Sequence, residues 1–527
     1  MYKSLFYVSL LISFVSAKSV TVLIEQGTIV GQTNDGYDTY FGIPFATVNE
    51  SNPFGNSIGP PRFETPFIAN DSSTLCPQVI FKISGTIQCL RLNIYVPKRN
   101  STNSRLAVFV WFHGGGFAFG SSGEYGGQHL VKEGIIVVTV NYRQGPYGFL
   151  CLRDSTVPGN QGMKDQADAL RWIRKNIFAF GGDSDKITIA GESYGGGAVD
   201  LHLYSEYDEK LLFDKAIVQS GSIFDEGFYV KPDHEAAIKI AKYLGHNVSK
   251  TRAALSLLAE EDPRSVMSAA LNLSLPMAVC KEKRYKGVKN FVTSDPFHLE
   301  TLHRIQNIKI MIGYTSMELL YVYANQTQEF WNKLGDVFYT GLDKNFEFKK
   351  ADLKALSGIL KKFYLGEKPI GPESILELSR ASSDFVVNHA MERSINKYME
   401  INATSVYKYM FSYTGGSQYK YINGSGAAHT EELRYLFEWE APISGAEQQM
   451  IRNRMTKLWS NFVKFGDPTP EVTETLPVLW KTLSGSSRPY MNIDVEMSMR
   501  TDAFLERMAF WDLFWYNYKK KSIVYDN

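Results

Sequence analysis

Short apolar segments alternate with an amphipathic helical segment in the first half of the chain, and this alternation constrains the fold most strongly. Four segments rich in β-branched and aromatic residues predict buried strands, at 106–112, 135–142, 187–190 and 216–219. Before the third of them, apolar residues at three- and four-residue spacing predict a helix over 163–180. This alternation predicts an α/β fold with a large, mostly parallel central sheet flanked by helices on both faces.

The second half of the chain continues this pattern. Further strands are expected at 308–312 and 406–413, and further helices at 235–244, 253–259 and 447–465. We find no Pro- or Gly-rich linker and no internal repeat, so 18–527 is predicted to be a single domain with helical insertions. The near balance of 56 basic and 55 acidic side chains argues against nucleic acid as a partner.

The N-terminal segment has the three regions of a secretory signal peptide. Lys3 precedes an apolar run, and the small residues Ser16 and Ala17 predict cleavage after Ala17. A buried N-terminal strand or helix is the alternative. No later stretch reaches the roughly eighteen consecutive apolar residues of a membrane span, and no retention or lipid-attachment signal ends the sequence. We therefore expect residues 1–17 to be removed and the protein to be secreted, without a membrane span.

Secretion would permit glycosylation and disulfide formation. The candidate N-glycosylation sites in Asn-x-Ser/Thr sequences are Asn49, Asn70, Asn100, Asn247, Asn272, Asn325, Asn402 and Asn423. Cys76 and Cys89 are the closest pair of cysteines and are expected to form a disulfide. Cys151 follows an apolar segment and is expected to be a buried thiol, which Cys280 could reach only if the fold brings them together. No Cys-x-x-Cys pair or His–Cys cluster predicts a metal site.

The sequence Gly-Glu-Ser-Tyr-Gly at 191–195 lies between an expected strand and an expected helix. This context indicates a nucleophile elbow, in which a sharp turn exposes the hydroxyl of Ser193 above the N-terminus of a helix. The motif alone is weak evidence, because Gly-Asn-Ser-Ile-Gly at 55–59 fits the same pattern. That second copy lies between prolines, with neither strand nor helix expected beside it, and we interpret it as a loop.

Three consecutive glycines follow the strand expected at 106–112. In His-Gly-Gly-Gly-Phe at 113–117, successive backbone N–H groups can turn toward one point, as an oxyanion hole requires. The N–H groups of Gly115, Gly116 and Tyr194 are the expected donors. A phosphate-binding loop is the alternative, but no Gly-Lys-Ser/Thr follows to hold a nucleotide.

A serine nucleophile needs a neutral imidazole, which a carboxylate orients. In folds that carry the serine on a nucleophile elbow, the acid and then the base follow the serine along the chain. This order excludes His113 and His129 as the base. His429 lies in a loop of small residues after an expected strand, and the other downstream histidines have less loop-like surroundings. The acid cannot be singled out by these arguments among so many carboxylates; Glu318, which follows the strand expected at 308–312, is one candidate.

Further motifs resemble the type-B carboxylesterase family of the α/β-hydrolase superfamily, which includes the cholinesterases. The resemblance runs from about residue 27 to 514 and includes Phe-Gly-Ile-Pro-Phe-Ala at 41–46, Asn-Tyr-Arg at 141–143, Asp-Gln-Ala-Asp-Ala-Leu at 165–170 and Gln-Ser-Gly at 219–221. The family spacing of Gly and acid fits 313–318, and Gly-x-x-His-x-x-Glu-Leu fits 426–433. The resemblance implies an α/β-hydrolase fold, a triad of Ser193, Glu318 and His429, and no cofactor.

The chain also departs from the family pattern. Tyr194 stands where Ala is usual, which retains the backbone donor but can reshape the entrance to the site. By contrast, the two residues of one ion pair of the family are both present, as Arg143 and Asp165. The loop between Cys76 and Cys89 contains no Trp that could stack on a quaternary ammonium group, which disfavours a cholinesterase.

These features predict a secreted serine esterase that hydrolyses small-molecule carboxylic esters through an acyl-enzyme. The alternatives are an esterase specialised for lipid or choline esters and a non-catalytic, cholinesterase-like adhesion or binding protein, which the complete set of motif residues disfavours. Apolar residues at helical spacing from Phe504 to Tyr518 could form a homodimer interface through the C-terminal helix, although packing on the same domain fits as well.

Overall fold

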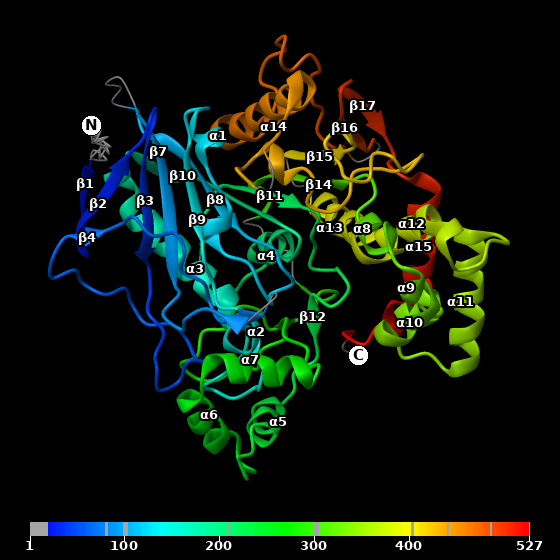
Figure 1. The fold of residues 1–527 in the computed structure, drawn as a ribbon, viewed down its shortest axis with the longest axis horizontal. Coiled ribbons are helices and arrows are strands. Elements are labelled where there is room, and N and C mark those ends of the chain that lie inside the picture. Colours follow the sequence, from blue (N-terminus) through cyan, green and yellow to red (C-terminus); the bar gives the residue numbers. More distant parts are fainter. Residues whose placement is uncertain are drawn as a thin grey trace, which may run out of the picture.

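One large β-sheet forms the centre of the molecule (Figure 1). The computed structural model describes residues 19–79, 83–98, 104–208, 210–299, 305–401, 405–439, 442–484 and 487–525, and the signal peptide expected at 1–17 lies outside them. Within these residues the strands run in the order β1-β2-β3-β7-β9-β8-β10-β11-β14-β15-β16-β17, with β4 beside β2. Their bounds are β1 (Ser19–Ile24), β2 (Gly27–Thr33), β3 (Tyr37–Pro44), β4 (Phe67–Ile68), β7 (Arg91–Pro97), β8 (Leu106–Phe112), β9 (Ile136–Val140), β10 (Gly182–Glu192), β11 (Lys215–Gln219), β14 (Lys309–Thr315), β15 (Ser405–Phe411), β16 (Pro489–Ile493) and β17 (Ser498–Thr501).

The central strands from β9 to β16 are parallel, whereas the strands along the main order toward both edges pair antiparallel. The short strand β4 pairs parallel with β2. This arrangement confirms the predicted mostly parallel sheet. Because neighbouring parallel strands end at the same edge, the loops that follow β8, β10, β14 and β15 meet there. These loops carry the expected oxyanion glycines, the serine, the acid and the histidine.

Helices cover both faces of the sheet.

In the described part of the chain, no helix combines the length and the apolar character that crossing a membrane requires. The helices are α1 (Gln128–Val131), α2 (Gly145–Phe149), α3 (Gln161–Asn176), α4 (Tyr194–His202), α5 (Ala236–Tyr243), α6 (Thr251–Glu260), α7 (Pro263–Asn272), α8 (Leu320–Tyr323), α9 (Gln328–Lys333), α10 (Val337–Asn345), α11 (Lys350–Leu365), α12 (Ile375–Ser383), α13 (His389–Glu400), α14 (Gly445–Phe465) and α15 (Leu505–Tyr518). A π-helical segment (Asp384–Asn388) joins α12 to α13.

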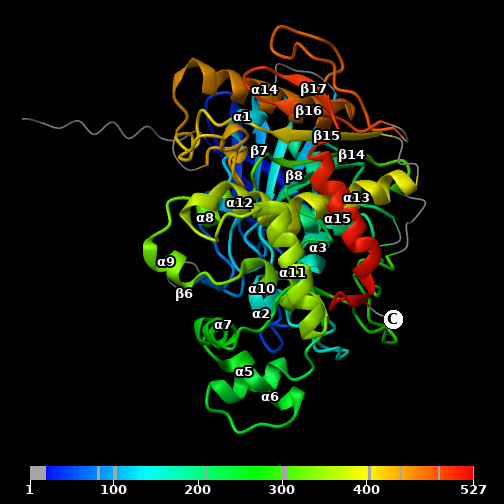
Figure 2. The same ribbon diagram turned by 90° about the vertical axis from the view of Figure 1, so that its right-hand side faces the viewer.

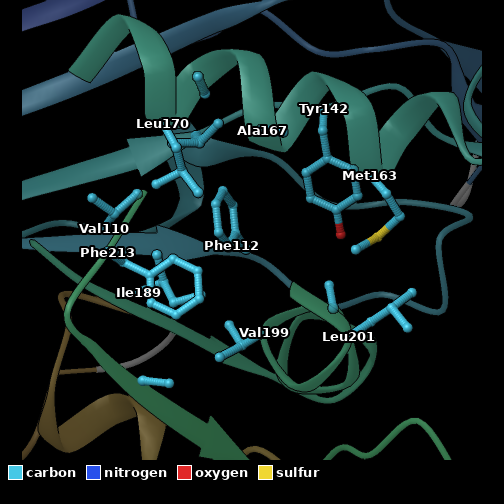
Figure 3. Packing of buried hydrophobic residues seen from close by; sticks show 14 of the residues in the cluster. Val110, Phe112, Tyr142, Met163, Ala167, Leu170, Ile189, Val199, Leu201 and Phe213 are labelled. Carbon is cyan, nitrogen blue, oxygen red and sulfur yellow. The ribbon is translucent and has the colours of Figure 1, made fainter. Parts of the chain in front are cut away.

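The core has two layers because successive side chains of a strand point to opposite faces. Val108, Val110 and Phe112 of β8 belong to the cluster under α3, α4 and α13, whereas Phe109 and Trp111 belong to the cluster under α14. Figure 3 shows side chains of β8 and β10 between those of α3 and α4: Val110, Phe112 and Ile189 from the strands, Ala167 and Leu170 from α3, and Val199 and Leu201 from α4. The sheet is therefore rigidly held from both sides behind the loops that it presents.

The structure confirms the strands and helices expected from the sequence, with small changes in their bounds. The strand expected at 106–112 is β8, and the helix expected at 163–180 ends at Asn176 and continues as a 3-10 turn to Phe180, which Gly181 closes with a φ of 84°. Residues 55–59 form a loop, as expected, and Ser57 donates a hydrogen bond to Asp168. The expected ion pair joins Arg143 to Asp165, with 2.7 Å between Nη2 and Oδ1.

Two groups of helices extend from the sheet (Figures 1 and 2). Helices α5, α6 and α7 pack around one small apolar cluster, and α10, α11 and α12 pack with α15 around another. Met508, Trp511 and Phe514 of α15 are buried in that second cluster, so this face of the helix packs on its own domain. Leu513 and Tyr516 on the other face are 63% and 81% exposed.

Two disulfides lie in the described residues. The expected bridge joins Cys76 to Cys89. Cys151 is buried, as expected, but it is not a free thiol: its pairing with Cys280, which the sequence left open, is formed in the structure. The fold brings the two together by placing β13 (Val279–Cys280) next to the turn at Asn160, where Asn160 Nδ2 donates to the carbonyl of Cys280 at 2.8 Å and Cys280 N donates back to Oδ1 at 2.9 Å.

Candidate active site

Ser193 occupies a strained turn between β10 and α4. Its φ of 58° lies in a region that side chains rarely adopt. A Cβ on Gly191 would collide with the backbone of Gly195, and a Cβ on Gly195 would collide with the carbonyl of Phe112. The turn is held by hydrogen bonds from Ser193 N to Gln219 O and from Gly197 N to Ser193 O, both at 2.9 Å. Glycines on either side of the serine thus permit the tight turn that the motif predicts.

The glycine loop after β8 lies directly against this turn. A Cβ on Gly114 would be 2.9 Å from Cβ of Ser193 and 2.7 Å from the carbonyl of Glu192, so only glycine fits there. Gly115 and Gly116 have φ values of 100° and 62°. The expected oxyanion donors, Gly115, Gly116 and Tyr194, line one cavity together with Ser193.

The expected acid and base lie in direct contact. Nδ1 of His429 is 2.5 Å from Oε2 of Glu318, which is fully buried. The other carboxylate oxygen, Oε1, accepts hydrogen bonds from Ser220 Oγ at 2.7 Å and from Thr315 N at 2.6 Å. Glu318 is therefore fixed by three donors, and it fixes the imidazole ring in turn.

These residues open into a cavity of about 430 Å³ with mostly apolar walls. Ser193, His429 and the glycine loop line it, and its larger apolar side chains are Phe119, Tyr125, Leu319, Tyr321, Val386, Val387 and Trp439. The Tyr194 hydroxyl donates to the carbonyl of Glu226 at 3.1 Å, and its ring packs on Phe117 and Phe228. Tyr194 is thus an anchored part of the cavity wall.

Comparison with known proteins identifies the family. A sequence model of the Carboxylesterase family matches residues 18–511. The chain belongs to the carboxylesterase family. It is 30% identical to Esterase FE4 of Myzus persicae over 503 residues, which cover 87% of this chain and 86% of that protein. It is 28% identical to the juvenile hormone esterase of Heliothis virescens, with 95% of both chains covered, and 28% identical to the bile salt-activated lipase of Bos taurus, with 94% of this chain and 88% of that protein covered.

Membership in the carboxylesterase family confirms the resemblance read from the motifs and the α/β-hydrolase fold that it implied. It also makes the protein a carboxylic ester hydrolase. The large parallel sheet with helices on both faces is the framework on which this family places its chemistry, and the loops at the carboxyl ends of the strands carry the candidate residues here.

The sequence analysis missed two buried carboxylates of this carboxylesterase. Oε1 of Glu192 lies 3.1 Å from Nε2 of His429, and Glu432 accepts a hydrogen bond from Gln219 Nε2 at 3.1 Å. Burial raises the pKa of Glu192 to about 8 and that of Glu432 to about 7. Both residues lie inside the motifs that pointed to Ser193 and His429, so their sequence positions were a signal that could have been used.

The carboxylates surround one imidazole. Burial alone would lower the pKa of His429, but Glu192, Glu318 and Glu432 together raise it to about 10. Ser193 and His429 line the same cavity, but no hydrogen bond joins their side chains in this structure, and the polar contact of Nε2 is with Glu192. The carboxylates of Glu318 and Glu192 thus contact the two nitrogens of the His429 ring and favour its charged form.

Proposed function

We propose that the protein is a secreted serine esterase that hydrolyses uncharged or weakly charged carboxylic esters through an acyl-enzyme formed on Ser193. The observation that carries this proposal is the convergence of Ser193, the glycine loop and the His429–Glu318 pair on one cavity. A non-catalytic binding protein would need none of these features. An acyl-transfer reaction needs an exposed serine on a strained turn and a buried acid that orients the histidine. Ser193 has the strained backbone, and Glu318 is fully buried.

In the proposed reaction, Oγ of Ser193 attacks the ester carbonyl carbon while His429 Nε2 accepts the hydroxyl proton. The N–H groups of Gly115, Gly116 and Tyr194 stabilise the oxyanion of the tetrahedral intermediate. The C–O bond to the alcohol then breaks, and His429 gives the proton to the leaving oxygen. A water molecule that loses a proton to His429 then attacks the acyl-enzyme. The bond between the acyl carbon and Oγ breaks, His429 returns the proton to Oγ of Ser193, and the carboxylic acid leaves.

The proton must first leave Nε2, and Glu192 supports this step. Because the pKa values of His429 and Glu192 are both raised and the groups are 3.1 Å apart, they share protons as a coupled pair. When the proton resides on Glu192, Nε2 is free to act as a base. The serine hydroxyl would then rotate toward Nε2, since catalytic hydrogen bonds often form only in the substrate complex.

A second candidate function is an esterase for longer acyl chains, such as those of lipid esters. The observation that favours it is an apolar cavity of about 140 Å³ next to the catalytic cavity, with Val386 in the wall of both. Phe338, Leu342, Leu360 and Trp511 are among its lining residues. A chain that passes Val386 would bury its end among them and gain apolar contact.

Secretion and glycosylation belong to the same proposal. Asn49, Asn70, Asn247, Asn272, Asn325 and Asn423 are all exposed, while Asn100 and Asn402 lie outside the described residues. The two disulfides suit an oxidising compartment. One relative carries the name Venom carboxylesterase-6 of Apis mellifera. We expect treatment with a glycosidase specific for N-linked glycans to lower the apparent mass of the protein collected from the medium.

We also propose a homodimer through α15. Leu513 and Tyr516 of α15 are exposed, as are Ile359 and Phe363 of α11, which are 55% and 42% exposed. The Phe363 ring stacks on Phe510 of α15 at 4.3 Å and joins the two helices. A second copy would cover this apolar face. Sedimentation should give a dimer for the wild type and a monomer for Leu513→Glu; a monomeric wild type would contradict it.

The decisive test of the esterase is hydrolysis of p-nitrophenyl acetate and hexanoate by the wild type, Ser193→Ala and Ser57→Ala. The second serine is a matched control, since it lies in the other Gly-x-Ser-x-Gly sequence and bonds to Asp168 in a loop. We expect Ser193→Ala to lose at least about 10⁴-fold in kcat and Ser57→Ala to keep its activity. Equal rates for the wild type and Ser193→Ala, or labelling by a phosphonate at another residue, would refute the nucleophile.

A further inference from the structure

A third cavity, of about 260 Å³, lies beside the catalytic cavity, and Asp225 contributes to the walls of both. Most of the segment from Ile223 to Val230, which follows β11, lines it. Arg393 of α13, Trp515 of α15, and Ile523 and Val524 near the C-terminus line it as well. Its volume is close to the lower limit of about 300 Å³ for cavities that bind small molecules.

Arg393 is the unusual residue of this cavity. Its guanidinium carbon lies 4.0 Å from the ring centres of Phe224 and Trp515 and 5.0 Å from that of Phe297. Aromatic faces attract the cation but do not satisfy the N–H donors at the edge of the guanidinium plane. Among the described residues, no hydrogen bond or ion pair reaches this guanidinium. An arginine placed this way presents its donors to the cavity without a protein partner.

The nearby acids form no direct ion pair with Arg393: Asp512, whose charge favours the guanidinium cation, lies 3.0 Å from His389 Nε2 instead. Oδ2 of Asp225 accepts from Ser222 N at 3.0 Å, but Oδ1 is buried without a partner. Burial raises the pKa of Asp225 well above its usual value, and burial also raises the pKa of Glu226. Burial lowers the pKa of Arg393 only to about 9, so the guanidinium keeps its charge at neutral pH. Lys344 adds a second cation to the lining.

We propose that this cavity binds the carboxylate of a small aliphatic acid, with Arg393 as the main binding residue and Asp225 as its polar partner. A carboxylate matches the planar fork of a guanidinium through two parallel hydrogen bonds. The unpartnered Oδ1 of Asp225 can carry a proton and donate it to the same ligand. Ile223, Val230 and Val524 supply apolar contacts for an aliphatic chain.

Two kinds of molecule can supply such a carboxylate. One is a free carboxylic acid of the kind that ester hydrolysis releases. The other is a substrate that is a half-ester of a dicarboxylic acid, whose acyl chain ends in a free carboxylate. Both sources rest on the proposed function, because the shared wall at Asp225 places this cavity next to the proposed acyl-enzyme. The binding of a free carboxylate does not depend on catalysis and can be measured by itself.

Calorimetric titration with hexanoate tests the site, with the uncharged amide hexanamide as a probe of equal size. Arg393→Met keeps the length of the side chain and removes its charge, and Arg393→Lys keeps the charge and removes the fork. Arg105→Met is the matched control, because Arg105 also lies over an aromatic ring, that of Phe178 at 3.2 Å, but is exposed.

We expect the wild type and Arg105→Met to bind hexanoate equally, Arg393→Met to bind it at least about tenfold more weakly, and Arg393→Lys to fall between them. Unchanged melting temperatures would show that the variants fold. Equal affinity of Arg393→Met and the wild type for hexanoate would overturn the proposal. So would equal affinity of the wild type for hexanamide and hexanoate.

Kinetics then separate the two sources. If the half-ester is the source, Arg393→Met loses kcat/KM for the p-nitrophenyl monoester of hexanedioic acid and keeps it for p-nitrophenyl hexanoate. If the free acid is the source, both esters keep their kcat/KM and only the binding of hexanoate is lost. A wild type that binds hexanoate but hydrolyses neither ester would refute the proposed function and leave the carboxylate site standing.

Discussion

Glu192 directly precedes the proposed nucleophile, and its Oε1 lies 3.1 Å from Nε2 of His429. The nitrogen that must accept the serine proton is therefore in contact with a buried acid in the free protein. Nδ1 of the same ring contacts Glu318 at 2.5 Å. The imidazole is held between two carboxylates. Together with Glu432 they favour its charged form and raise its pKa to about 10 against the effect of burial.

Replacing Glu192 by Gln should shift the pH dependence of activity to lower pH. The base must be neutral, so kcat/KM falls as the pH drops through the pKa of His429. Removing one carboxylate lowers this pKa. We therefore expect the fall of kcat/KM on the acid side of the pH profile to occur at a pH lower by about one unit or more. Glu124→Gln is the control, because Glu124 lines the same cavity but bonds to Ser121. A fall at an unchanged pH, or at a higher one, would contradict the role given to Glu192.

Replacing Ser220 by Ala should weaken the support of the proposed acid. Ser220 Oγ donates to Oε1 of buried Glu318 at 2.7 Å, and a hydrogen bond to a charged group contributes about 1.5–3 kcal/mol. We expect a loss of this size in the free energy of unfolding, measured with denaturant, and a lower kcat. Ser460→Ala is the matched control, since Ser460 is equally buried and its Oγ has no partner. Equal stability of both variants would show that Ser220 does not hold Glu318.

The sequence was most informative where strands are buried on both faces. The strand expected at 106–112 has the same bounds as β8, because every residue from Ala107 to Phe112 is buried and apolar. The antiparallel strands β1, β2, β3 and β7 were not predicted. β1 is mostly exposed or half-buried and lies at the edge of the sheet, so its residues carry little hydrophobic signal.

For the candidate site too, features set by neighbouring residues could be predicted from the sequence, whereas contacts between distant residues could not. The turn at Ser193 depends on glycines two residues away, and the motif displays them. The contact of Glu192 with His429 joins residues 237 positions apart (429 − 192), and no local pattern reports it. The motifs contained Glu192 and Glu432, but only the fold shows that both carboxylates face one histidine.

Replacing Gly114 by Ala should impair catalysis more than folding. The new Cβ would lie 2.9 Å from Cβ of Ser193 and 2.7 Å from the carbonyl of Glu192, so the glycine loop must move away from the serine. Because small displacements of reacting groups cost about 10²-fold, we expect kcat to fall by at least this factor. In Gly358→Ala, a helical position with open space, activity should stay unchanged and the helix should gain up to about 1 kcal/mol. A fully active Gly114→Ala would refute the close approach.

Removing the Cys151–Cys280 disulfide should destabilise the protein more than removing Cys76–Cys89. The first bridge joins residues separated by 129 positions and the second by 13, and a longer closed loop restricts the unfolded chain more. The chain-entropy model gives about 3 kcal/mol for a loop of roughly 15 residues and more than about 4.5 kcal/mol for one beyond 100. Paired Cys→Ser variants should show this order in denaturant unfolding. The reverse order would mean that the segments near Asn160 stay together in the unfolded chain without the bridge, so that the covalent bond adds little restriction there.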